Sequence, residues 1–312
     1  MTDLYSIGEM LIDFIPGAEP GSYIYKAGGA PANVAIAVAK NGLNAAMCCK
    51  VGDDGFGQIL LNTLREYGVR IACESPCKEA ITTLAFVTLA EDGERRFTFA
   101  RKPGADMMLA EDEVLEEDIR DSVIIHAGSC SLSAQPEAAA TVRALRLGRQ
   151  YEKLVSFDVN YRALMWNHDE KACAEAVMNL LQYVDLLKIS EEEVDMLGGV
   201  EAIEGLMREK HITLVVETLG SHGAKAFFGG KTLTVPGKKV KAIDATGAGD
   251  AFWGAFLSKL RLSGVEKAGD LTEKIIHGAL EYGNVSGSIC VQQKGAIDAI
   301  PTRAQIEACM KS

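Results

Sequence analysis

The chain has 312 residues, which allows one large α/β domain or at most two domains, with a core that needs no disulfides or metal. Its 48% hydrophobic and 24% charged residues are the balance of an ordinary globular protein, so disorder and fibrous repeats are excluded. The 43 acidic and 32 basic residues give a net charge of −11, which disfavours nucleic acid or an anionic lipid surface as the main partner.

The eight cysteines form no CxxC pair and no Cys/His cluster with zinc spacing. The N-terminus lacks the basic segment of a signal peptide, and no uncharged apolar run is long enough to cross a membrane. We therefore expect a cytoplasmic protein with reduced thiols.

Short apolar runs alternate with helical patterns through most of the chain. The strands are predicted at 5–14, 123–127, 154–158, 186–189 and 213–217. Several of these runs are too continuously apolar to have a wet face, which indicates a buried and largely parallel sheet. The helices are predicted at 31–42, 56–67, 134–150, 169–182, 191–197, 201–210, 251–262 and 271–288. This alternation is typical of a doubly wound α/β fold.

One region breaks the alternation. Residues 81–101 are predicted to form two strands joined by the turn Asp92-Gly93. On the second strand, one face carries Phe97, Phe99 and Arg101. Because a hairpin outside the main sheet buries little by itself, its apolar face is expected to cover a ligand, a second copy of the chain, or both. Residues 15–26 and 81–101 are therefore predicted to form a small β lid.

The stretch Asp244-Ala245-Thr246-Gly247-Ala248-Gly249-Asp250 leads into an apolar helix. The free amides of a helix N-terminus favour an anion, and glycines let a ligand approach closely. Asp250 can accept a proton from a substrate hydroxyl while the amides of Gly247, Ala248 and Gly249 stabilise charge on a transferring group. The alternative is a tight turn with a capping aspartate. The stretch lacks the GxGxxG spacing of dinucleotide sites, and the chain has no GxxxxGK[ST] loop.

A second stretch, Lys26-Ala27-Gly28-Gly29-Ala30-Pro31-Ala32-Asn33, precedes the first predicted helix. Pro31 suits the first position of that helix, and the Gly28-Gly29 pair exposes backbone donors just before it. Asn33 is suited to hydrogen-bond a polyol. By itself this pattern is weak, because a glycine turn before a helix explains it equally well.

Together, about 220 residues apart, the two stretches resemble the ribokinase-like (PfkB) carbohydrate kinase family. The Asp-x-Thr-Gly-Ala-Gly-Asp run is the most specific signature of that family, and the Gly-Gly-Ala-Pro-Ala-Asn-Val-Ala form resembles its bacterial and plant fructokinases. The resemblance covers residues 4–303 and implies a single kinase domain over 1–312. The implied fold has Rossmann-like αβα layers around a mostly parallel sheet, plus a small β-sheet lid that often forms a dimer interface.

The resemblance also implies roles for individual residues. Asp250 matches the catalytic base, and the anion hole is matched by Gly247, Ala248 and Gly249. Sugar contacts are implied for Asp13, Gly28, Gly29, Asn33, Arg101 and Arg162, the last through the pattern Asp158-x-Asn160-x-Arg162 followed by Trp166. ATP contacts are implied for Thr218, Gly220, Ser221, Gly223 and Asn284. A monovalent-cation site, for K⁺, is implied at Asp244 and Thr246, with carbonyls from 290–299 completing it.

Two positions depart from the family pattern. The Asn-x-x-Glu motif, linked to Mg²⁺ and phosphate, appears as Ser190-Glu191-Glu192-Glu193, which keeps Glu193 but leaves the placement of Mg²⁺ open. The residue before Arg101 is alanine, where relatives often carry an aromatic side chain, so sugar stacking in the lid is expected to differ.

The expected reaction is in-line transfer of the ATP γ-phosphoryl group to a hydroxyl of a ketohexose, with fructose favoured, in a homodimer that associates through the lid. The alternative acceptor is 2-keto-3-deoxygluconate, whose carboxylate would pair with Arg101 and Arg162. Two other classes are a silent sugar-binding regulator, disfavoured because Asp250 is present, and a dinucleotide-dependent oxidoreductase, disfavoured because GxGxxG is missing. The hydroxyl that reacts, the K⁺ dependence and the oligomeric state stay open.

Overall fold

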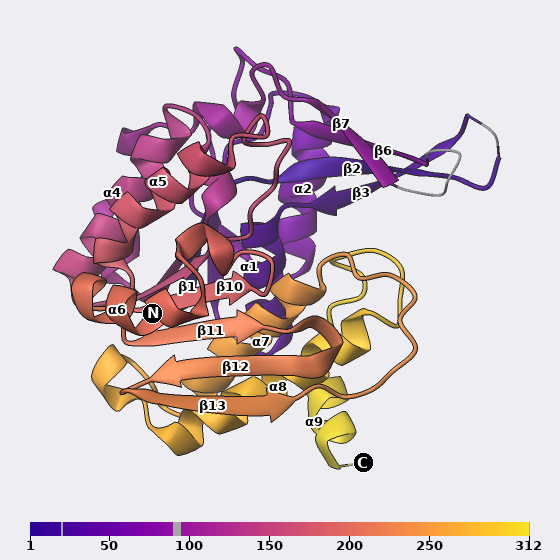
Figure 1. The fold of residues 1–312 in the computed structure, drawn as a ribbon. Helices are drawn as coiled ribbons and strands as arrows, with labels where there is room; N and C mark the ends of the chain where they lie inside the picture. Colours follow the sequence, from indigo (N-terminus) through magenta and orange to yellow (C-terminus); the bar gives the residue numbers. More distant parts are fainter. Residues whose placement is uncertain (20, 90–94, 312) are drawn as a thin grey trace.

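The computed structural model describes residues 1–19, 21–89 and 95–311, which form a large α/β body and a small sheet that projects from it (Figure 1). Among these residues the main sheet has nine strands, in the order β13-β12-β11-β10-β9-β8-β1-β4-β5. The parallel strands are β1 (Thr2–Ile7), β4 (Ala45–Cys48), β5 (Arg70–Ile71), β8 (Ser122–Gly128), β9 (Leu154–Asp158), β10 (Leu186–Ser190) and β11 (Leu214–Thr218). An antiparallel edge is formed by β12 (Gly223–Phe228) and β13 (Lys231–Pro236).

Helices cover both faces of this sheet. One face carries α1 (Ala30–Lys40), α2 (Gly55–Glu66), α7 (Ala248–Leu262) and α8 (Glu273–Cys290), with α9 (Arg303–Lys311) packed on α8. The other face carries α3 (Glu116–Arg120), α4 (Glu137–Gln150), α5 (Glu170–Leu180) and α6 (Val200–Lys210). The predicted αβα layers around a mostly parallel sheet are therefore confirmed.

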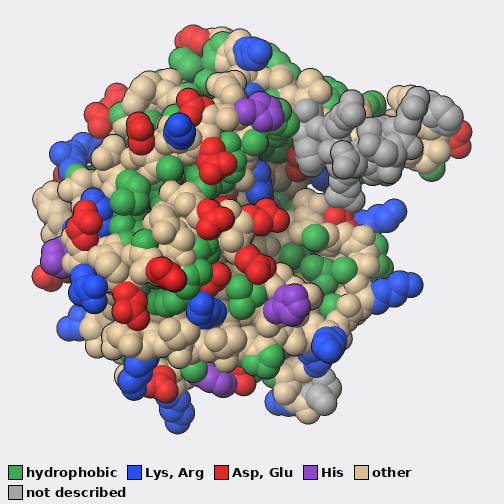
Figure 2. All heavy atoms as spheres, viewed as in Figure 1, with side chains coloured by type: hydrophobic (Ala, Val, Ile, Leu, Met, Phe, Trp, Pro, Cys, Tyr) green, Lys and Arg blue, Asp and Glu red, His purple; other side chains and the backbone are tan. Residues whose placement is uncertain are grey.

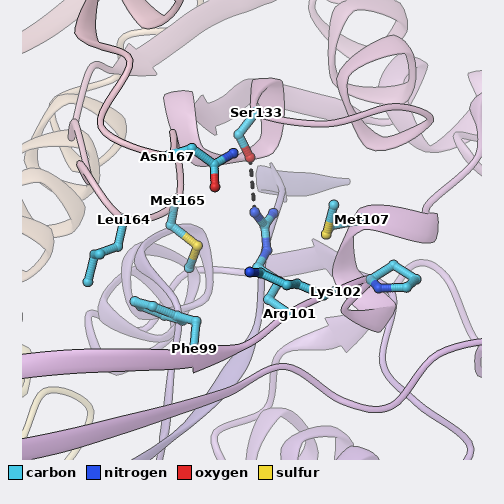
Figure 3. Close-up of a pocket in the computed structure, with 9 residues that line it drawn as sticks. Phe99, Arg101, Lys102, Met107, Ser133, Leu164, Met165 and Asn167 are labelled. Carbon is cyan, nitrogen blue, oxygen red and sulfur yellow. Dashed lines mark hydrogen bonds between the residues drawn. The ribbon is translucent and has the colours of Figure 1, made fainter.

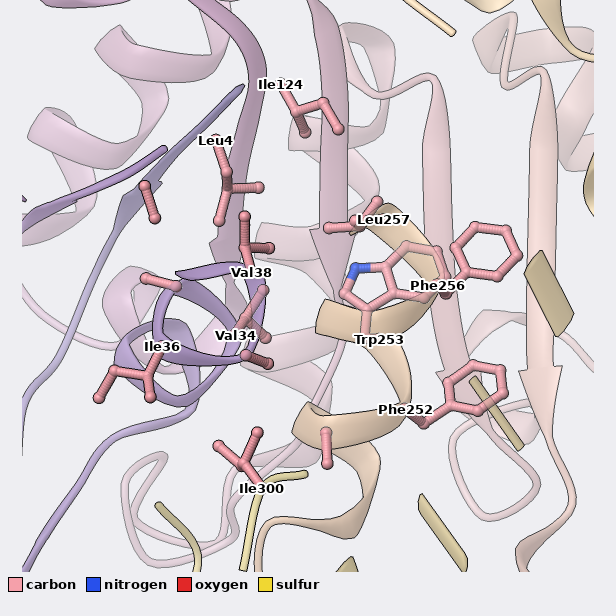
Figure 4. Close-up of a cluster of buried hydrophobic side chains, with 14 of the residues drawn as sticks. Leu4, Val34, Ile36, Val38, Ile124, Phe252, Trp253, Phe256, Leu257 and Ile300 are labelled. Atoms are coloured by element: carbon pink, nitrogen blue, oxygen red, sulfur yellow. The ribbon is translucent and has the colours of Figure 1, made fainter. Parts of the chain in front are cut away.

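The strand sequences explain why there are two hydrophobic layers. Side chains alternate between the faces of a strand, so Leu4 packs into one cluster and Tyr5 into the other, as do Leu154 and Val155. The cluster around α1 and α7 is built on the fully buried Trp253 (Figure 4).

The two helices of this cluster approach each other closely. A Cβ on Gly254 of α7 would lie 2.4 Å from the Cβ of Ala37 on α1, so only glycine allows this packing. The close approach brings the N-terminal ends of α1 and α7 side by side, where the predicted site residues lie.

In the described part of the lid, four strands form a sheet in the order β3-β2-β6-β7. Its strands are β2 (Leu11–Pro16), β3 (Tyr23–Gly28), β6 (Leu84–Leu89) and β7 (Arg95–Ala100), close to the predicted 15–26 and 81–101. The predicted hairpin is confirmed by the antiparallel pairing of β6 and β7, while the turn Asp92-Gly93 lies outside the described residues.

The single strand predicted over 5–14 is wrong. The structure divides it into β1 of the main sheet and β2 of the lid, with the break at Gly8, where φ is +145°. Few other residues adopt this conformation, and it lets the chain leave the main sheet. Asp13 therefore belongs to the lid.

The helix predicted over 191–197 is also wrong, because the segment forms turns and a short 3₁₀ helix, Asp195–Leu197. Glu193 accepts backbone hydrogen bonds that hold the turn, and Gly198 ends it with a left-handed φ of +95°. The other predicted helices are present with small shifts in their ends. Within the part of the chain that the structure describes, no helix is long and apolar enough to cross a membrane.

Candidate active site

The predicted catalytic stretch lies at the N-terminus of α7, beside the carboxyl ends of β9 and β10. In open α/β sheets this edge is where ligands bind. The surface between the body and the base of the lid is hollowed, and acidic side chains gather beside this hollow (Figure 2).

Gly247 precedes α7 with a left-handed φ of +75°, and a Cβ at this position would lie 2.8 Å from the Cβ of Ala296. Both the conformation and the space require glycine here. The backbone therefore turns so that the amides of residues 247–249 lie at the N-terminus of α7, where the helix dipole favours an anion.

Asp250 lies in the first turn of α7 and is only 6% exposed. Burial raises the pKa of its carboxyl to about 6, although the hydrogen bond from Asn33 and the charges of Arg162 and Lys188 lower it. The Nδ2 of Asn33 donates to Oδ2 of Asp250 at 2.7 Å. A carboxylate with this pKa is ionised at neutral pH and accepts a proton more readily than an ordinary aspartate.

The predicted sugar-binding residues from the lid lie near the same place. Asp13 on β2 has its pKa raised to about 6 by burial, and the positive charge of Arg162 opposes this shift. A Cβ at Gly28 would lie 2.5 Å from Oδ2 of Asp13, so the glycine keeps room for that carboxylate. Gly29 has a φ of +118° and precedes α1, the helix that carries Asn33.

The charge of Arg162 acts on both this lid carboxylate and Asp250 and lowers the pKa of each. The residue as a whole is exposed to solvent, whereas protein atoms surround its guanidinium. Desolvation lowers its pKa, but Cys130, Asp250 and Asp158 together raise the pKa above its ordinary value. The structure therefore brings together Asp250, Asn33, Arg162, Asp13, Gly28 and Gly29.

Arg101, the other predicted sugar ligand, lies deeper in the protein. It donates from Nε to Asp106 at 2.7 Å, from Nη1 to Ser133 at 3.0 Å and from Nη2 to Glu137 at 3.3 Å. Its side chain is 6% exposed and its three nitrogens are engaged by protein groups. Its contact with a sugar stays a prediction.

Arg101 nevertheless lines a cavity of about 310 Å³ between β7 and the segment that follows Arg162 (Figure 3). The cavity is lined by Phe99, Arg101, Lys102, Pro103, Met107, Ser133, Leu164, Met165 and Asn167. The end of lid strand β7 thus borders this cavity, and Arg101 is the one predicted sugar residue among the described residues that line it.

The predicted nucleotide residues lie along the neighbouring strand ends. Ser190 ends β10, and its amide donates to Oε2 of Glu193 at 2.8 Å, while the amide of Tyr161 donates to Oε1 at 2.7 Å. Thr218 ends β11, and Gly220 and Ser221 are exposed in the turn that follows it.

Two more of these residues shape the end of that turn. Gly223 has a φ of +104°, and a Cβ there would lie 2.2 Å from the carbonyl oxygen of Val235. Asn284 on α8 donates to the same carbonyl at 3.0 Å. Neither observation shows a contact with ATP, so the nucleotide roles of Gly223 and Asn284 stay predictions.

The predicted cation site is a hydrogen-bonded loop. Oδ1 of Asp244 accepts from the amide of Thr246 at 3.0 Å and from its hydroxyl at 2.7 Å, and Oδ2 accepts from the amide of Gly295 at 3.2 Å. These bonds join the 244–247 loop to the 290–299 segment, next to the N-terminus of α7.

Sequence reasoning missed one charged residue at this site. Lys188 on β10 donates to both oxygens of Asp158, at 2.9 and 2.8 Å, and the side chain of each residue is at least 94% buried. The signal in the sequence was a lysine within an otherwise apolar strand, which is unusual because a buried charge is costly unless it is paired.

The model of the pfkB family of carbohydrate kinases matches residues 1–303. The chain belongs to this family. A probable fructokinase-5 of Arabidopsis thaliana is 40% identical over 99% of this chain and 97% of its own length.

Two solved structures extend the likeness to the fold. A fructokinase from Xylella fastidiosa with bound ATP superposes with a TM-score of 0.91 and 29% identity, over 99% of this chain and 98% of its own. A fructokinase from Vibrio cholerae O395, described in a fructose, ADP and calcium ion bound form, has a TM-score of 0.86 and 33% identity over 99% and 98%. The expected ribokinase-like architecture and sugar-kinase activity are therefore confirmed, and the chain is a carbohydrate kinase.

Proposed function

We propose that this pfkB family member is a fructokinase, which transfers the γ-phosphoryl group of ATP to a hydroxyl of fructose. One observation carries the proposal: a buried aspartate, Asp250, is held by Asn33 at 2.7 Å in the first turn of a helix whose free amides are suited to a phosphoryl group. The similarity to fructokinases over nearly the whole chain supports fructose as the acceptor.

Asp250 is proposed to orient the fructose hydroxyl and to take its proton as the new oxygen–phosphorus bond forms. A positioned general base of this kind contributes about 10²–10⁴-fold to the rate. Asp13, Asn33 and Arg162 surround the same space and are proposed to hold the other hydroxyls of the sugar.

The amides of residues 247–249 are proposed to stabilise the negative charge that shifts during transfer. Phosphoryl transfer passes through a loose transition state, so positioning and charge stabilisation dominate catalysis. A donor of this kind is worth about 3 kcal/mol in comparable anion holes.

Mg²⁺, when bound, would neutralise charge on the nucleotide phosphates. Among the described residues no three His, Cys, Asp or Glu side chains gather as metal ligands. Mg²⁺ in kinases is held by one or two carboxylates together with phosphates and waters, and Glu193 is the carboxylate suited to this. Because both its oxygens already accept backbone amides, Glu193 is proposed to act through water.

The loop of Asp244 and Thr246 is proposed to hold K⁺. Asp244 supplies a carboxylate, and its bonds to Thr246 and Gly295 bring two loops with backbone carbonyls together. Oxygen donors suit a hard cation. Because Gly247 packs on Ala296, a cation bound between the two loops would influence the position of the amides at the start of α7.

We propose further that two copies associate through the lid. Ile24 is 55% exposed and lies on the same lid face as Asp13, while Tyr25 on the opposite face is 50% exposed. Exposed apolar residues on a small sheet favour a partner surface. A cytoplasmic location is proposed because the seven cysteines from Cys48 to Cys290 are buried free thiols.

The alternative acceptor, 2-keto-3-deoxygluconate, has a carboxylate that needs a cationic partner. The guanidinium of Arg101 is engaged by Asp106, Ser133 and Glu137, whereas Arg162 near Asp250 is the more exposed of the two arginines. Because Arg101 is already paired within the protein, it is less available to a substrate carboxylate. The site therefore favours a neutral ketohexose as the acceptor.

Coupled measurement of ADP release with fructose, 2-keto-3-deoxygluconate, ribose and adenosine tests the assignment. We expect kcat/KM for fructose to exceed each of the others at least about tenfold, since one polar group left unpaired in a buried site costs about 1–3 kcal/mol. If kcat/KM were higher for another acceptor, that acceptor would take the place of fructose as the assigned substrate. If none of the acceptors caused ADP release, a sugar-binding regulator would be favoured.

A further inference from the structure

Lys188 and Asp158 form a buried ion pair at the carboxyl edge of the main sheet. The two residues are direct neighbours in the parallel register of β9 and β10, so their side chains leave the same face of the sheet. The Nζ of Lys188 lies 2.9 and 2.8 Å from the two oxygens of Asp158, and the side chains are 6% and 3% exposed. Each charge is therefore fully dependent on the protein for its partners.

Stability does not account for this pair. Removing two charges from water costs several kcal/mol per ion, and well-packed hydrophobic residues in place of a buried pair are often equally or more stable. Leu186, two positions earlier and therefore on the same face of β10, is fully buried in the hydrophobic cluster on that face, so an apolar side chain suits this side of the strand. A charge at position 188 therefore points to a task other than packing.

The ammonium of Lys188 faces the start of α7. Its Nζ lies 3.6 Å from the position that a Cβ of Gly249 would take, so the glycine leaves the space in front of the ammonium open. Two of the three ammonium protons face Asp158, which leaves one for another acceptor. That direction is the anion site formed by the amides of α7.

Nearby carboxylates keep the lysine charged. Burial lowers the pKa of Lys188, but Asp158, Glu193 and Asp250 raise it by more, so the ammonium stays protonated. Arg162 lies near Asp250 and Asp158 as well. Two cations and a helix N-terminus thus converge on one place, which is suited to a group with several negative charges.

We propose that Lys188 contacts the phosphoryl group in transit between nucleotide and sugar, and that Asp158 holds the ammonium in position. As the sugar oxygen bonds to the γ-phosphorus, the bond from that phosphorus to the bridging oxygen of ATP breaks, and Asp250 takes the hydroxyl proton. Lys188 keeps all its protons and supplies charge only. The inference rests on the proposed phosphoryl transfer but not on fructose being the acceptor.

The test compares two variants that both lack the ion pair. Asp158→Asn keeps the ammonium, whereas Lys188→Met/Asp158→Asn removes it without leaving a buried unpaired carboxylate. Calorimetry measures the binding of fructose, of MgADP, and of fructose with MgADP and aluminium fluoride, which mimics the transferring group. Steady-state kinetics give kcat and KM, and thermal unfolding checks that each variant is folded.

Relative to Asp158→Asn, we expect the double variant to lose at least about tenfold in kcat and in affinity for the fluoride complex. Its affinities for fructose alone and MgADP alone should change less than about threefold. Equal losses for fructose alone and for the fluoride complex, or an unchanged kcat, would overturn the proposal. If Lys188→Met/Asp158→Asn does not fold, Lys188→Gln/Asp158→Asn supplies a hydrogen-bonding amide pair with the same expectation.

A failure of the fructose assignment remains distinguishable. The wild-type enzyme is first assayed with the sugar panel, and the comparison uses whichever acceptor it phosphorylates. Because the fluoride complex reports on the transferred group and not on the acceptor, the role of Lys188 is then tested with that sugar in place of fructose.

Discussion

The catalytic end of the body and the lid are built in different ways. At the start of α7 three carboxylates have fixed protein partners: Asp250 is held by Asn33, Asp158 by Lys188, and Glu193 by two amides. In the lid, Phe14 stacks on Phe86 with ring centroids 4.8 Å apart and meets Phe56 of α2 at 5.5 Å.

This difference indicates that the body and the lid have separate roles. The groups proposed to handle charge are fixed in advance by the body, which is how electrostatic stabilisation becomes effective in a site. The lid contributes Asp13 and an apolar surface, and it is joined to the body by the contact of Phe14 with Phe56 and by the ion pair of Lys26 on β3 with Asp298 at 2.6 Å. Chemistry is therefore expected to depend on the body, and association between copies on the lid.

The largest effect is expected at the proposed base. Asp250→Asn keeps the size and the hydrogen-bonding capacity of the side chain but cannot take a proton, so kcat should fall about 10²–10⁴-fold while fructose affinity changes little. Steady-state kinetics and calorimetry measure the two quantities. The exposed Asp112→Asn serves as the control and should resemble the wild type. Near-normal turnover of Asp250→Asn would remove this residue from the mechanism.

A smaller effect is expected for the turn before α7. Gly247→Ala places a Cβ 2.8 Å from Ala296 at a φ of +75°, which costs about 1–3 kcal/mol in strain and displaces the amides. We expect a lower midpoint of thermal unfolding and a fall of about tenfold in kcat.

Gly264→Ala is the matched control for this turn. Gly264 has a φ of +84°, but no atom lies within 4 Å of the position that a Cβ would take, so this variant carries the backbone strain alone. It should lose stability without losing kcat. If both variants kept full kcat, the turn at Gly247 would not position the reacting groups.

The pH dependence offers a third comparison. The pKa of both Asp250 and Asp13 is raised to about 6, so kcat/KM should be highest above this pH and fall as acid protonates the carboxylates. Asn33→Leu removes a donor that lowers the pKa of Asp250, and the acidic limb of the profile should therefore move to higher pH. A limb that stays in place would mean that another group controls the acidic side.

The smallest effect on kcat is expected from a substitution on lid strand β3. Ile24→Glu places a charge on an apolar side chain that is 55% exposed, and it should shift the protein from dimer to monomer in sedimentation velocity experiments. The midpoint of thermal unfolding of the body should change little, because the residue adds little to its core. Val200→Glu, at an exposed position of α6, is the control. A wild-type chain that sediments as a monomer would contradict the lid-mediated dimer.

Local patterns predicted much of this fold because they depend on neighbouring residues. The apolar strands β8 to β11 are recognisable from runs of four or five residues, and the DATGAGD stretch contains both the glycines and the helix start that form an anion site. The antiparallel pair β12 and β13 was missed, although the Gly229-Gly230 turn between them is a hairpin signal.

The sequence by itself determined the alternation of strands and helices, the turn that opens α7, and the kinase family, since these follow from periodicity and from a short specific motif. Only the tertiary structure decided that residues 5–14 divide between two sheets, that the guanidinium of Arg101 pairs with Asp106 and Glu137, and that Lys188 faces Gly249. The physical reason is that a charge takes its role from its partners and burial, and packing brings these together from distant parts of the chain.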